Sequence, residues 1–218
     1  SIQTADIDKD GDQDIILGNM GENNKFNPST EKPLGILASD FDDSGSIDIV
    51  LTKEYKGKTV PVRGKECSTE QMPFLEEKFP TYDGFASSGI EDILGADKIS
   101  IANQKAVTTF SSIVLINKGN MNFEVQRLPT PAQWSPIMDM IIDDFDKDGN
   151  IDIVVAGNMY DTEPETPAYD AGRGLLLNGN GDGTFSTSNL IQYSGLNISR
   201  NVRTDNILVI AIAYQINI

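Results

Sequence analysis

The sequence predicts an all-β fold assembled from repeated strand–loop–strand units. An acidic pattern of nine residues, D-x-D-x-[DS]-G-x-x-D, occurs three times, over residues 6–14, 40–48 and 144–152. Each copy runs into a short, β-branched apolar segment bounded by Gly or polar residues, which is typical of a buried strand. Three copies in one phase are far beyond chance, so this repeat is the organising feature of the chain.

A second repeated unit predicts β-hairpins. Residues 177–185 have the sequence Leu-Asn-Gly-Asn-Gly-Asp-Gly-Thr-Phe, and residues 116–123 repeat the pattern as Ile-Asn-Lys-Gly-Asn-Met-Asn-Phe. Each segment has an apolar run before it and a turn rich in Gly and Asn inside it. Because Gly and Asn adopt the backbone conformations that tight turns require, each segment is expected to join two antiparallel strands.

Composition excludes several classes of function. The chain of 218 residues is long enough to bury a core without disulfides, and its lone Cys67 allows none within the chain. Its 33 acidic and 17 basic residues give a formal net charge of −16, which repels nucleic acids and anionic lipid. It contains no histidine, so serine-triad hydrolysis and His-ligated zinc are excluded. We therefore expect neither nucleic-acid binding nor histidine-based catalysis.

The sequence carries no membrane or export signal. No apolar run approaches the length of about 18 residues that a membrane-spanning helix requires, so no membrane insertion is expected. The chain begins at Ser1 only a few residues before a complete acidic motif, without a signal peptide. We therefore expect it to be an excised or processed piece of a longer protein.

The spacing of the acidic loops suits a metal ion. Oxygen-bearing side chains at positions one, three and five converge as the chain curls, and Gly at position six permits the sharp turn. Position seven offers its carbonyl, and the Asp at position nine completes the shell. Several hard oxygen ligands in a flexible loop favour Ca²⁺ over Mg²⁺, so up to three Ca²⁺ sites are expected. The predicted ligands are Asp6, Asp8, Asp10, Asp14 and the Asp12 carbonyl in the first loop, Asp40, Asp42, Ser44, Asp48 and the Ser46 carbonyl in the second, and Asp144, Asp146, Asp148, Asp152 and the Asn150 carbonyl in the third.

Two other interpretations of the loops are less favoured. An EF-hand starts similarly but needs Glu at position twelve and a helix on each side, whereas position twelve here is Leu17, Leu51 or Val155. Asp/Gly-rich surface turns are common for backbone reasons alone, but three copies in one phase and the mutual repulsion of clustered carboxylates favour a bound cation. Ser44 replaces a carboxylate in the second loop, so that site is expected to be the weakest.

The loops and hairpins together resemble those of a known family. Loops of the form D-x-D-x-D-G-x-x-D-[IV], paired with L-x-N-x-G-x-G-x-F hairpins, are similar to the FG-GAP or VCBS repeats of integrin α-like β-propellers. The resemblance is closer still to bacterial surface proteins of the ASPIC/UnbV type, relatives of cartilage acidic protein. It extends to stretches outside the loops, namely Leu128-Pro129 and residues 132–136, 156–158 and 172–177.

This resemblance implies a β-propeller. Each repeat would belong to one four-stranded blade, with calcium held in the loop between two strands. The implied role is a noncatalytic, integrin-like scaffold, outside the cell or at its surface, that binds proteins or glycans.

The repeat period predicts a partial propeller. At about 40 to 60 residues a blade, residues 1–218 would form a single propeller-type domain or fragment of about three to four blades. From Asp40 to Asp144 is 104 residues, so a helical insertion between blades is expected over 68–101. Residues 201–218 would begin a degenerate blade, and the open edges of an incomplete ring favour self-association.

Within this insertion, the sequence predicts two short helices. Ser68 starts a capping-box pattern ahead of the first helix, and Ser88 offers a cap ahead of the second. Met72, Leu75 and Phe79 follow the first cap at spacings of three and four residues. This spacing places them on one helix face, where they are expected to serve core packing.

Two classes of function are compatible with the sequence. The favoured one is a calcium-binding, noncatalytic scaffold for adhesion or for recognition of a protein or glycan, at the cell surface or outside the cell, which in a bacterium includes the periplasm and outer membrane. The alternative is an enzyme for glycans or phosphoesters that uses carboxylates on the propeller face. Almost every clustered Asp belongs to a loop, however, and the other acids, such as Glu76, Glu77, Glu163 and Glu165, are typical of solvated surfaces. The chain is therefore expected not to be an enzyme.

Overall fold

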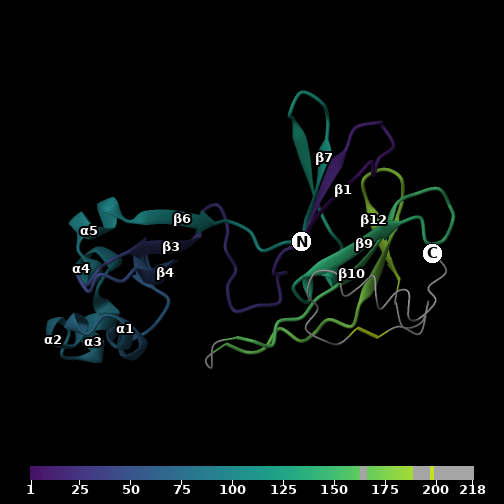
Figure 1. Ribbon diagram of the computed structural model, residues 1–218. Coiled ribbons are helices and arrows are strands. Elements are labelled where there is room, and N and C mark those ends of the chain that lie inside the picture. The colour runs from purple at the N-terminus through teal and green to yellow at the C-terminus, as the bar shows by residue number, and fades with distance from the viewer. Residues whose placement is uncertain (163–165, 189–196, 199–218) are drawn as a thin grey trace. The chain divides into compact units, whose positions relative to one another are not determined.

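A computed structural model of the protein describes residues 1–162, 166–188 and 197–198 (Figure 1). The predicted degenerate blade over 201–218 lies outside the described residues, as do Glu163 and Glu165. None of the described helices is long and apolar enough to cross a membrane.

The chain divides into two compact units. Unit 1 combines Ser1–Lys25 with the chain from Phe110 onward, and unit 2 is the intervening segment Phe26–Thr109. Three four-stranded antiparallel sheets provide the framework, two in unit 1 and one in unit 2. The all-β prediction is therefore confirmed for the sheets. The description as one propeller-type domain over 1–218 stays a prediction.

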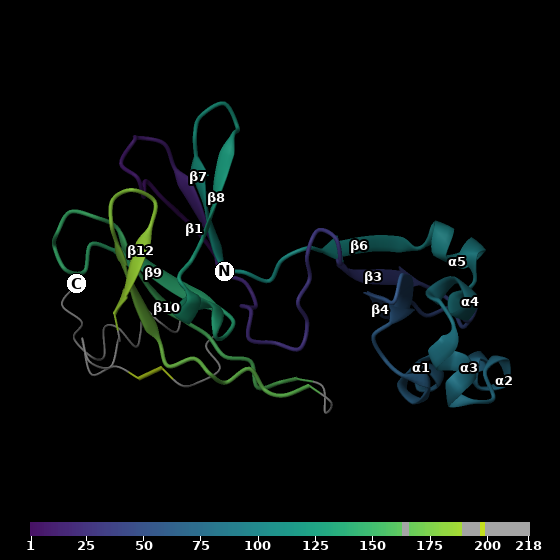
Figure 2. The same cartoon turned by 180° about the vertical axis from the view of Figure 1, so that it is seen from behind.

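The two sheets of unit 1 both follow the order of the chain. The first sheet has the strand order β1-β2-β7-β8 and the second β12-β11-β10-β9, and all their pairings are antiparallel (Figures 1 and 2). Unit 2 is inserted between β2 and β7, so each sheet is a simple up-and-down arrangement once the insertion is removed. The strands are β1 (Ile2–Ala5), β2 (Asp14–Leu17), β7 (Ile113–Asn117), β8 (Phe123–Arg127), β9 (Asp139–Asp143), β10 (Asp152–Ala156), β11 (Leu175–Gly179) and β12 (Phe185–Ser188).

Both predicted hairpins are confirmed in unit 1. Strands β7 and β8 pair from Ile113↔Arg127 to Asn117↔Phe123, and β11 and β12 end at the equivalent pair Gly179↔Phe185. At the second turn the Asn180 N–H donates to the Thr184 carbonyl at 3.0 Å, which closes the hairpin. Gly119 and Asn120 in the first turn and Gly181 and Gly183 in the second adopt positive φ values, which Gly and Asn tolerate better than other residues.

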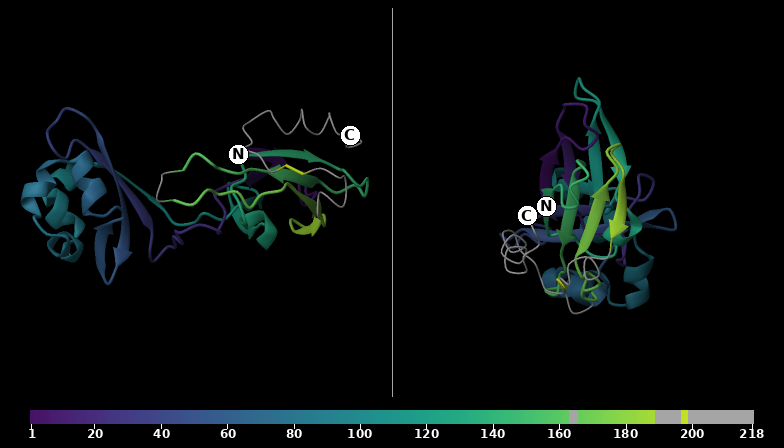
Figure 3. Two further views of the ribbon diagram at one scale, coloured as in Figure 1. Left: turned by 90° about the horizontal axis from the view of Figure 1, so that it is seen from below. Right: turned by 90° about the vertical axis from the view of Figure 1, so that its right-hand side faces the viewer.

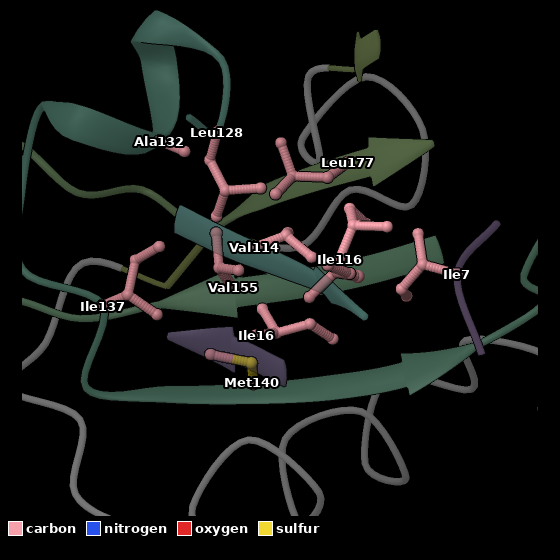
Figure 4. Packing of buried hydrophobic residues seen from close by; sticks show 11 residues of the cluster. Ile7, Ile16, Val114, Ile116, Leu128, Ala132, Ile137, Met140, Val155 and Leu177 are labelled. Carbon is pink, nitrogen blue, oxygen red and sulfur yellow. The ribbon is translucent and has the colours of Figure 1, made fainter. Parts of the chain in front are cut away.

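One hydrophobic core joins the two sheets of unit 1. Ile16 and Val114 from the first sheet meet Ile153, Val155 and Leu177 from the second, and each of the five side chains is at most 4% exposed (Figure 4). A short 3₁₀ helix, η1 (Thr130–Gln133), closes the core by contributing Ala132. Burial of aliphatic side chains on this scale is the main source of stability in such a core.

The two sheets of unit 1 pack through opposite faces. Ile16 lies two residues after Asp14, and its equivalent in the second sheet is Val154, two residues after Asp152. Val154, however, lies in a separate cluster on the far face of the second sheet, while its neighbour Ile153 faces Ile16 in the shared core. The face of the first sheet that carries Ile16 therefore meets the face of the second sheet opposite to Val154, the equivalent of Ile16. Such a contact between non-equivalent faces is called head-to-tail.

Unit 2 is a sheet covered by helices. Its sheet has the order β5-β4-β3-β6, and Figure 3 (left) shows the helices gathered beside it. Leu37 and Val50 of the sheet pack with Phe85, Ile93 and other helix residues in one buried cluster. The elements are β3 (Leu34–Ser39), β4 (Asp48–Tyr55), β5 (Lys58–Pro61), α1 (Lys65–Gln71), α2 (Phe74–Lys78), α3 (Tyr82–Ser87), α4 (Ile90–Leu94), α5 (Ala96–Ile101) and β6 (Asn103–Val107).

The helices of unit 2 differ from the prediction in number and in their caps. Five short helices replace the predicted two, and the first begins at Lys65 with Gly64 as its N-cap. Ser68 is therefore buried inside α1, where its N–H donates to the Gly64 carbonyl at 3.1 Å. Ser88 is also not a cap, because Gly89 precedes α4 and donates its N–H to the Asp92 carboxylate at 3.1 Å.

The core role predicted for the apolar positions of the insertion is confirmed. Met72 and Leu75 are at most 2% exposed, and Phe79 packs against the same cluster. Helix positions in unit 2 thus follow the burial of apolar side chains rather than the capping signals in the sequence.

Candidate metal centres

Each acidic loop joins two antiparallel strands in the same register. The Asp at position nine always pairs with the residue just before the loop, as Ala5↔Asp14, Ser39↔Asp48 and Asp143↔Asp152. The flanking strands are β1 and β2, β3 and β4, and β9 and β10. The predicted strand–loop–strand unit is confirmed, and the helices that an EF-hand would need are absent from all three described loops.

The backbone of each loop curls through the Gly at position six. Gly11, Gly45 and Gly149 have φ values of 96°, 85° and 87°, which a side chain would strain. In each loop this Gly N–H donates to the Asp at position one, at 3.1, 2.8 and 2.9 Å. A Cβ on Gly11 or Gly45 would meet no atom within 4 Å, so the requirement for Gly is conformational.

These curled loops bring carboxylates together. One oxygen from each member of a triad lies within 4.8 Å of the other two, and such a group could hold a metal ion. The three triads are Asp6, Asp8 and Asp10, then Asp40, Asp42 and Asp48, then Asp144, Asp146 and Asp152. Sequence spacing therefore identified carboxylates that the fold gathers at one point in each loop.

The remaining predicted ligands lie in the same loops but are not members of the triads. Asp14 and Asp148 lie in their loops outside the triads, and Ser44 takes the place of Asp148 in the second loop. The Ser44 N–H donates to Asp40 at 2.9 Å and to Asp42 at 3.1 Å, and its hydroxyl accepts from the Ser46 N–H at 3.3 Å. The carbonyl role predicted for Asp12, Ser46 and Asn150 stays a prediction.

Two of the loop carboxyls are held in the ionised form. The Gly45 N–H is the main reason that the pKa of Asp40 lies below its ordinary value. The Asn150 N–H has the same effect on the pKa of Asp148, to which it donates at 2.7 Å. Each carboxylate is thus negative at neutral pH and available to a cation.

The Asp at position nine also accepts backbone hydrogen bonds, a role that was not predicted from the sequence. The Asp14 side chain is fully buried, and it accepts from the Ile7 N–H within its own loop and from the Asn117 N–H of β7, both at 2.8 Å. Asp152 repeats this arrangement with Phe145 and with Gly179 of β11, both at 2.9 Å. Asp14 and Asp152 therefore tie each loop to the hairpin that follows it in the sheet.

Burial and hydrogen bonds have opposite effects on the pKa of Asp152. Removal of its carboxyl from water raises the pKa of Asp152, and the Gly179 and Phe145 N–H groups act in the opposite direction. A cation beside the carboxyl would also favour the charged form. One feature of the sequence indicates this anchoring role: among the acids of each loop, only the Asp at position nine directly precedes the apolar strand.

The first loop contains buried oxygen atoms that lack a partner. Asp6 Oδ1 and Asp8 Oδ1 are buried and have no hydrogen-bond donor among the described residues. The Asp8 side chain is only 11% exposed, and its other oxygen accepts from Lys118 Nζ at 2.8 Å. Buried polar atoms are normally satisfied, so these two oxygens are suited to a missing positive ligand.

Several lysine side chains lie close to the acidic loops in the described structure. Besides Lys118, Lys9 of the first loop donates to Asn150 Oδ1 of the third at 2.6 Å, which links the two loops of unit 1. In unit 2, Lys98 of α5 donates to the Phe41 carbonyl and to Asp43 of the second loop, both at 2.8 Å. Sequence reasoning missed these pairs because each joins residues far apart in the chain.

Comparison of the chain with protein-family models, curated proteins and solved structures finds no match. The resemblance to FG-GAP and VCBS repeats therefore stays a prediction based on the loops and hairpins themselves.

Proposed function

We propose that this chain is a calcium-binding, noncatalytic β-propeller scaffold for adhesion or recognition outside the cell. The observation that carries the proposal is the first loop, where three carboxylates converge and two buried oxygens lack a donor. The same backbone curl recurs in the second and third loops, so one structural solution is used three times.

A cation would resolve the electrostatic cost of each loop. Three carboxylates whose oxygens lie within 4.8 Å of one another repel unless a positive charge compensates them. In the first loop, Lys118 reaches only one oxygen of Asp8. A bound ion could contact Asp6 Oδ1 and Asp8 Oδ1 together, which no single described donor does.

The donor set favours calcium among the common metal ions. The candidate ligands are carboxylate, hydroxyl and carbonyl oxygens, and the chain has no histidine. Its one cysteine, Cys67, lies in α1 outside the loops. Hard oxygens in a flexible loop suit Ca²⁺, whereas Mg²⁺ requires near-ideal octahedral geometry and transition metals prefer nitrogen or sulfur.

The packing of unit 1 supports the propeller. Each of its sheets has four antiparallel strands in chain order, as propeller blades do. The head-to-tail contact, in which Ile16 of one sheet meets Ile153 of the next, is one that can be repeated from blade to blade. This repeatability, together with the resemblance to FG-GAP and VCBS repeats, supports a propeller built from such sheets.

The chemistry of the loops supports the proposed extracellular setting. Exposed loops of this kind bind calcium weakly, and extracellular calcium sites work in the range of about 10⁻⁴ to 10⁻³ M. Calcium at that concentration would order the loops and hold a recognition surface for a protein or glycan.

Thermal unfolding tests the calcium proposal directly. After treatment with a chelator, the melting temperature is measured against added Ca²⁺ and, separately, Mg²⁺. We expect a rise with Ca²⁺ alone that shrinks in Asp8→Asn and in Asp146→Asn, since each variant removes one charge from a triad. The matched control Asp170→Asn changes an exposed acid of unit 1 outside the loops and should keep the full response. No response of the parent protein to either ion would refute calcium binding.

A further inference from the structure

Three stretches of unit 1 that the acidic loops do not use meet at one cavity. Residues 131–132, 134–137, 155–157 and 171–175 line a space of about 510 Å³, together with Thr187 and Ser188 of β12. This volume lies within the range of small-molecule binding sites, about 300 to 1,000 Å³. These are also stretches that carry the sequence resemblance outside the loops and hairpins, so the cavity gives them a common location.

Internal hydrogen bonds hold the wall of this cavity in place. The buried Asn158 donates its amide to the Gly172 carbonyl at 3.1 Å and accepts from the Gly172 N–H at 2.8 Å. Ser135 donates its hydroxyl to the Gly157 carbonyl at 2.9 Å. A Cβ on Gly157 would collide with the Pro136 carbonyl, so the main chain itself forms this part of the wall. These contacts therefore fix the part of the cavity wall that residues 135, 157 and 172 form.

The lining combines an apolar surface with one charge. Trp134 is 54% exposed and lines the cavity together with apolar residues such as Ile137, Val155 and Leu175. Arg173 is the one charged side chain among the described lining residues, although the chain has 33 acids and 17 basic residues. A negatively charged protein thus has a cavity whose described lining contributes only a positive charge.

Arg173 is oriented by its own main chain. Its Nη1 donates to the Asp170 carbonyl at 3.2 Å and to the Gly172 carbonyl at 3.1 Å. Both described hydrogen bonds use the same nitrogen, which leaves Nε and Nη2 for a ligand. These two nitrogens form the edge of the guanidinium group that binds a carboxylate through two parallel hydrogen bonds.

We propose that this cavity binds a ligand in which a six-membered ring with an apolar face carries one carboxylate. The ring would lie against the Trp134 indole and the neighbouring apolar wall, and the carboxylate would pair with Arg173. A uronic acid of a glycan and a nonsugar ring acid share this chemistry. The site supplies a ligand class for the recognition role proposed above, on which it rests, but it uses none of the acidic loops.

Tryptophan fluorescence of the full chain tests this assignment, because Trp134 is the only tryptophan. In saturating calcium, the protein is titrated with glucuronate and with cyclohexanecarboxylate, and then with the neutral counterparts glucose and cyclohexanecarboxamide. We expect a saturable change with at least one acid and binding about tenfold or more weaker for its neutral counterpart. The acid that binds distinguishes a sugar ligand from a nonsugar one.

Variants locate the binding. Arg173→Gln should weaken acid binding by about tenfold or more, while the matched control Arg63→Gln, in unit 2, should leave it unchanged. Calorimetry should show that Trp134→Ala loses binding and that Trp134→Phe retains part of it. A cooperative thermal transition like that of the parent checks that each variant is folded, and the rise of its melting temperature with Ca²⁺ tests the calcium proposal separately. The assignment is wrong if neither acid gives saturable binding, if neutral counterparts bind equally well, or if folded Arg173→Gln binds like the parent.

Discussion

The Asp at position nine is held by two main-chain donors in the first and third acidic loops, and by one main-chain and one side-chain donor in the second. Asp14 and Asp152 each accept two backbone N–H groups, one of them from the neighbouring hairpin strand. Asp48 accepts one backbone N–H, from Phe41 at 2.9 Å, and its other oxygen accepts from the Gln71 side chain at 3.3 Å. The same nine-residue pattern is thus supported in two ways.

This difference follows from what lies beside each loop. In unit 1 a hairpin strand runs alongside, and its regular backbone presents an N–H at a fixed place. In unit 2 the loop is bordered by helices, whose internal N–H groups already serve the helix, so Gln71 and Lys98 supply the donors instead. The residues of the loop therefore determine its backbone curl, and the neighbouring elements determine how firmly that curl is held.

Removal of the Asp at position nine should cause the largest loss of stability. Asp152→Ala leaves two buried N–H groups without acceptors and should lower the free energy of unfolding by about 3 to 5 kcal/mol, against about 1 to 3 kcal/mol for Asp48→Ala. Urea unfolding followed by circular dichroism, in excess chelator so that no metal contributes, measures both. Asp152→Asn, which keeps one acceptor oxygen, should fall between Asp152→Ala and the parent. Equal losses at the two positions would show that the two kinds of anchor are equivalent.

Substitution of the loop glycines tests the backbone curl that the acidic loops have in common. Gly11→Ala and Gly45→Ala should each cost about 1 to 2 kcal/mol, because a Cβ strains the positive φ although space is available. The matched control is Gly64→Ala, where φ is −71° and a Cβ also meets nothing within 4 Å. Urea unfolding should place both loop variants below this control by a similar amount. A loss confined to one loop would mean that the curl is not a common element.

The local parts of this architecture could be predicted from the sequence. The Gly of each loop, the short β-branched apolar runs and turn residues such as Asn180 are local signals that span a few positions. The loops, strands and hairpins could therefore be predicted. The carboxylate triads were found for the same reason, because their members are at most eight residues apart.

Long-range contacts decided the features that the sequence missed. Asp14 and its donor Asn117 are 103 residues apart, and Lys118 and Asp8 are 110 residues apart, so no local pattern records either pair. The start of α1 at Lys65 and the burial of Ser68 likewise depend on packing against the sheet of unit 2. The cavity beside Trp134 needs three separate stretches and could not be seen in any one of them.

If the loops bind calcium as proposed, Lys118 should make the affinity of the first loop differ from that of the third. Its ammonium group contacts Asp8, which raises the pKa of Lys118 and places a positive charge beside the predicted ion. Lys118→Met should therefore increase the calcium affinity of the first loop several-fold, with a small loss of stability in chelator. Calorimetric titration in the Asp146→Asn background, which weakens the third loop, isolates this effect. An unchanged or lower affinity would show that the lysine does not compete with the ion.

Loss of the ion pair between Glu22 and Arg127 should change stability least. Glu22 serves as a reference, because its carboxylate is paired with a side-chain cation and lies outside the acidic loops. Arg127 Nη2 lies 2.6 Å from Glu22, and this contact is the main reason that the pKa of Glu22 is lowered from 4.5 to about 2. A lowered pKa in the folded state stabilises the protein above pH 4.5, and that contribution is lost as the pH falls from about 4.5 to about 2. Because both side chains are about 40% exposed, solvent screening should keep the contribution of the pair below about 1 kcal/mol.

Urea unfolding measures this contribution. The free energies of unfolding of the parent and of Glu22→Gln should differ slightly at pH 6 and converge toward pH 2, while their responses to calcium stay equal. A weaker calcium response in Glu22→Gln would mean that the loops are sensitive to surface charge in general and not to the carboxylates that line them.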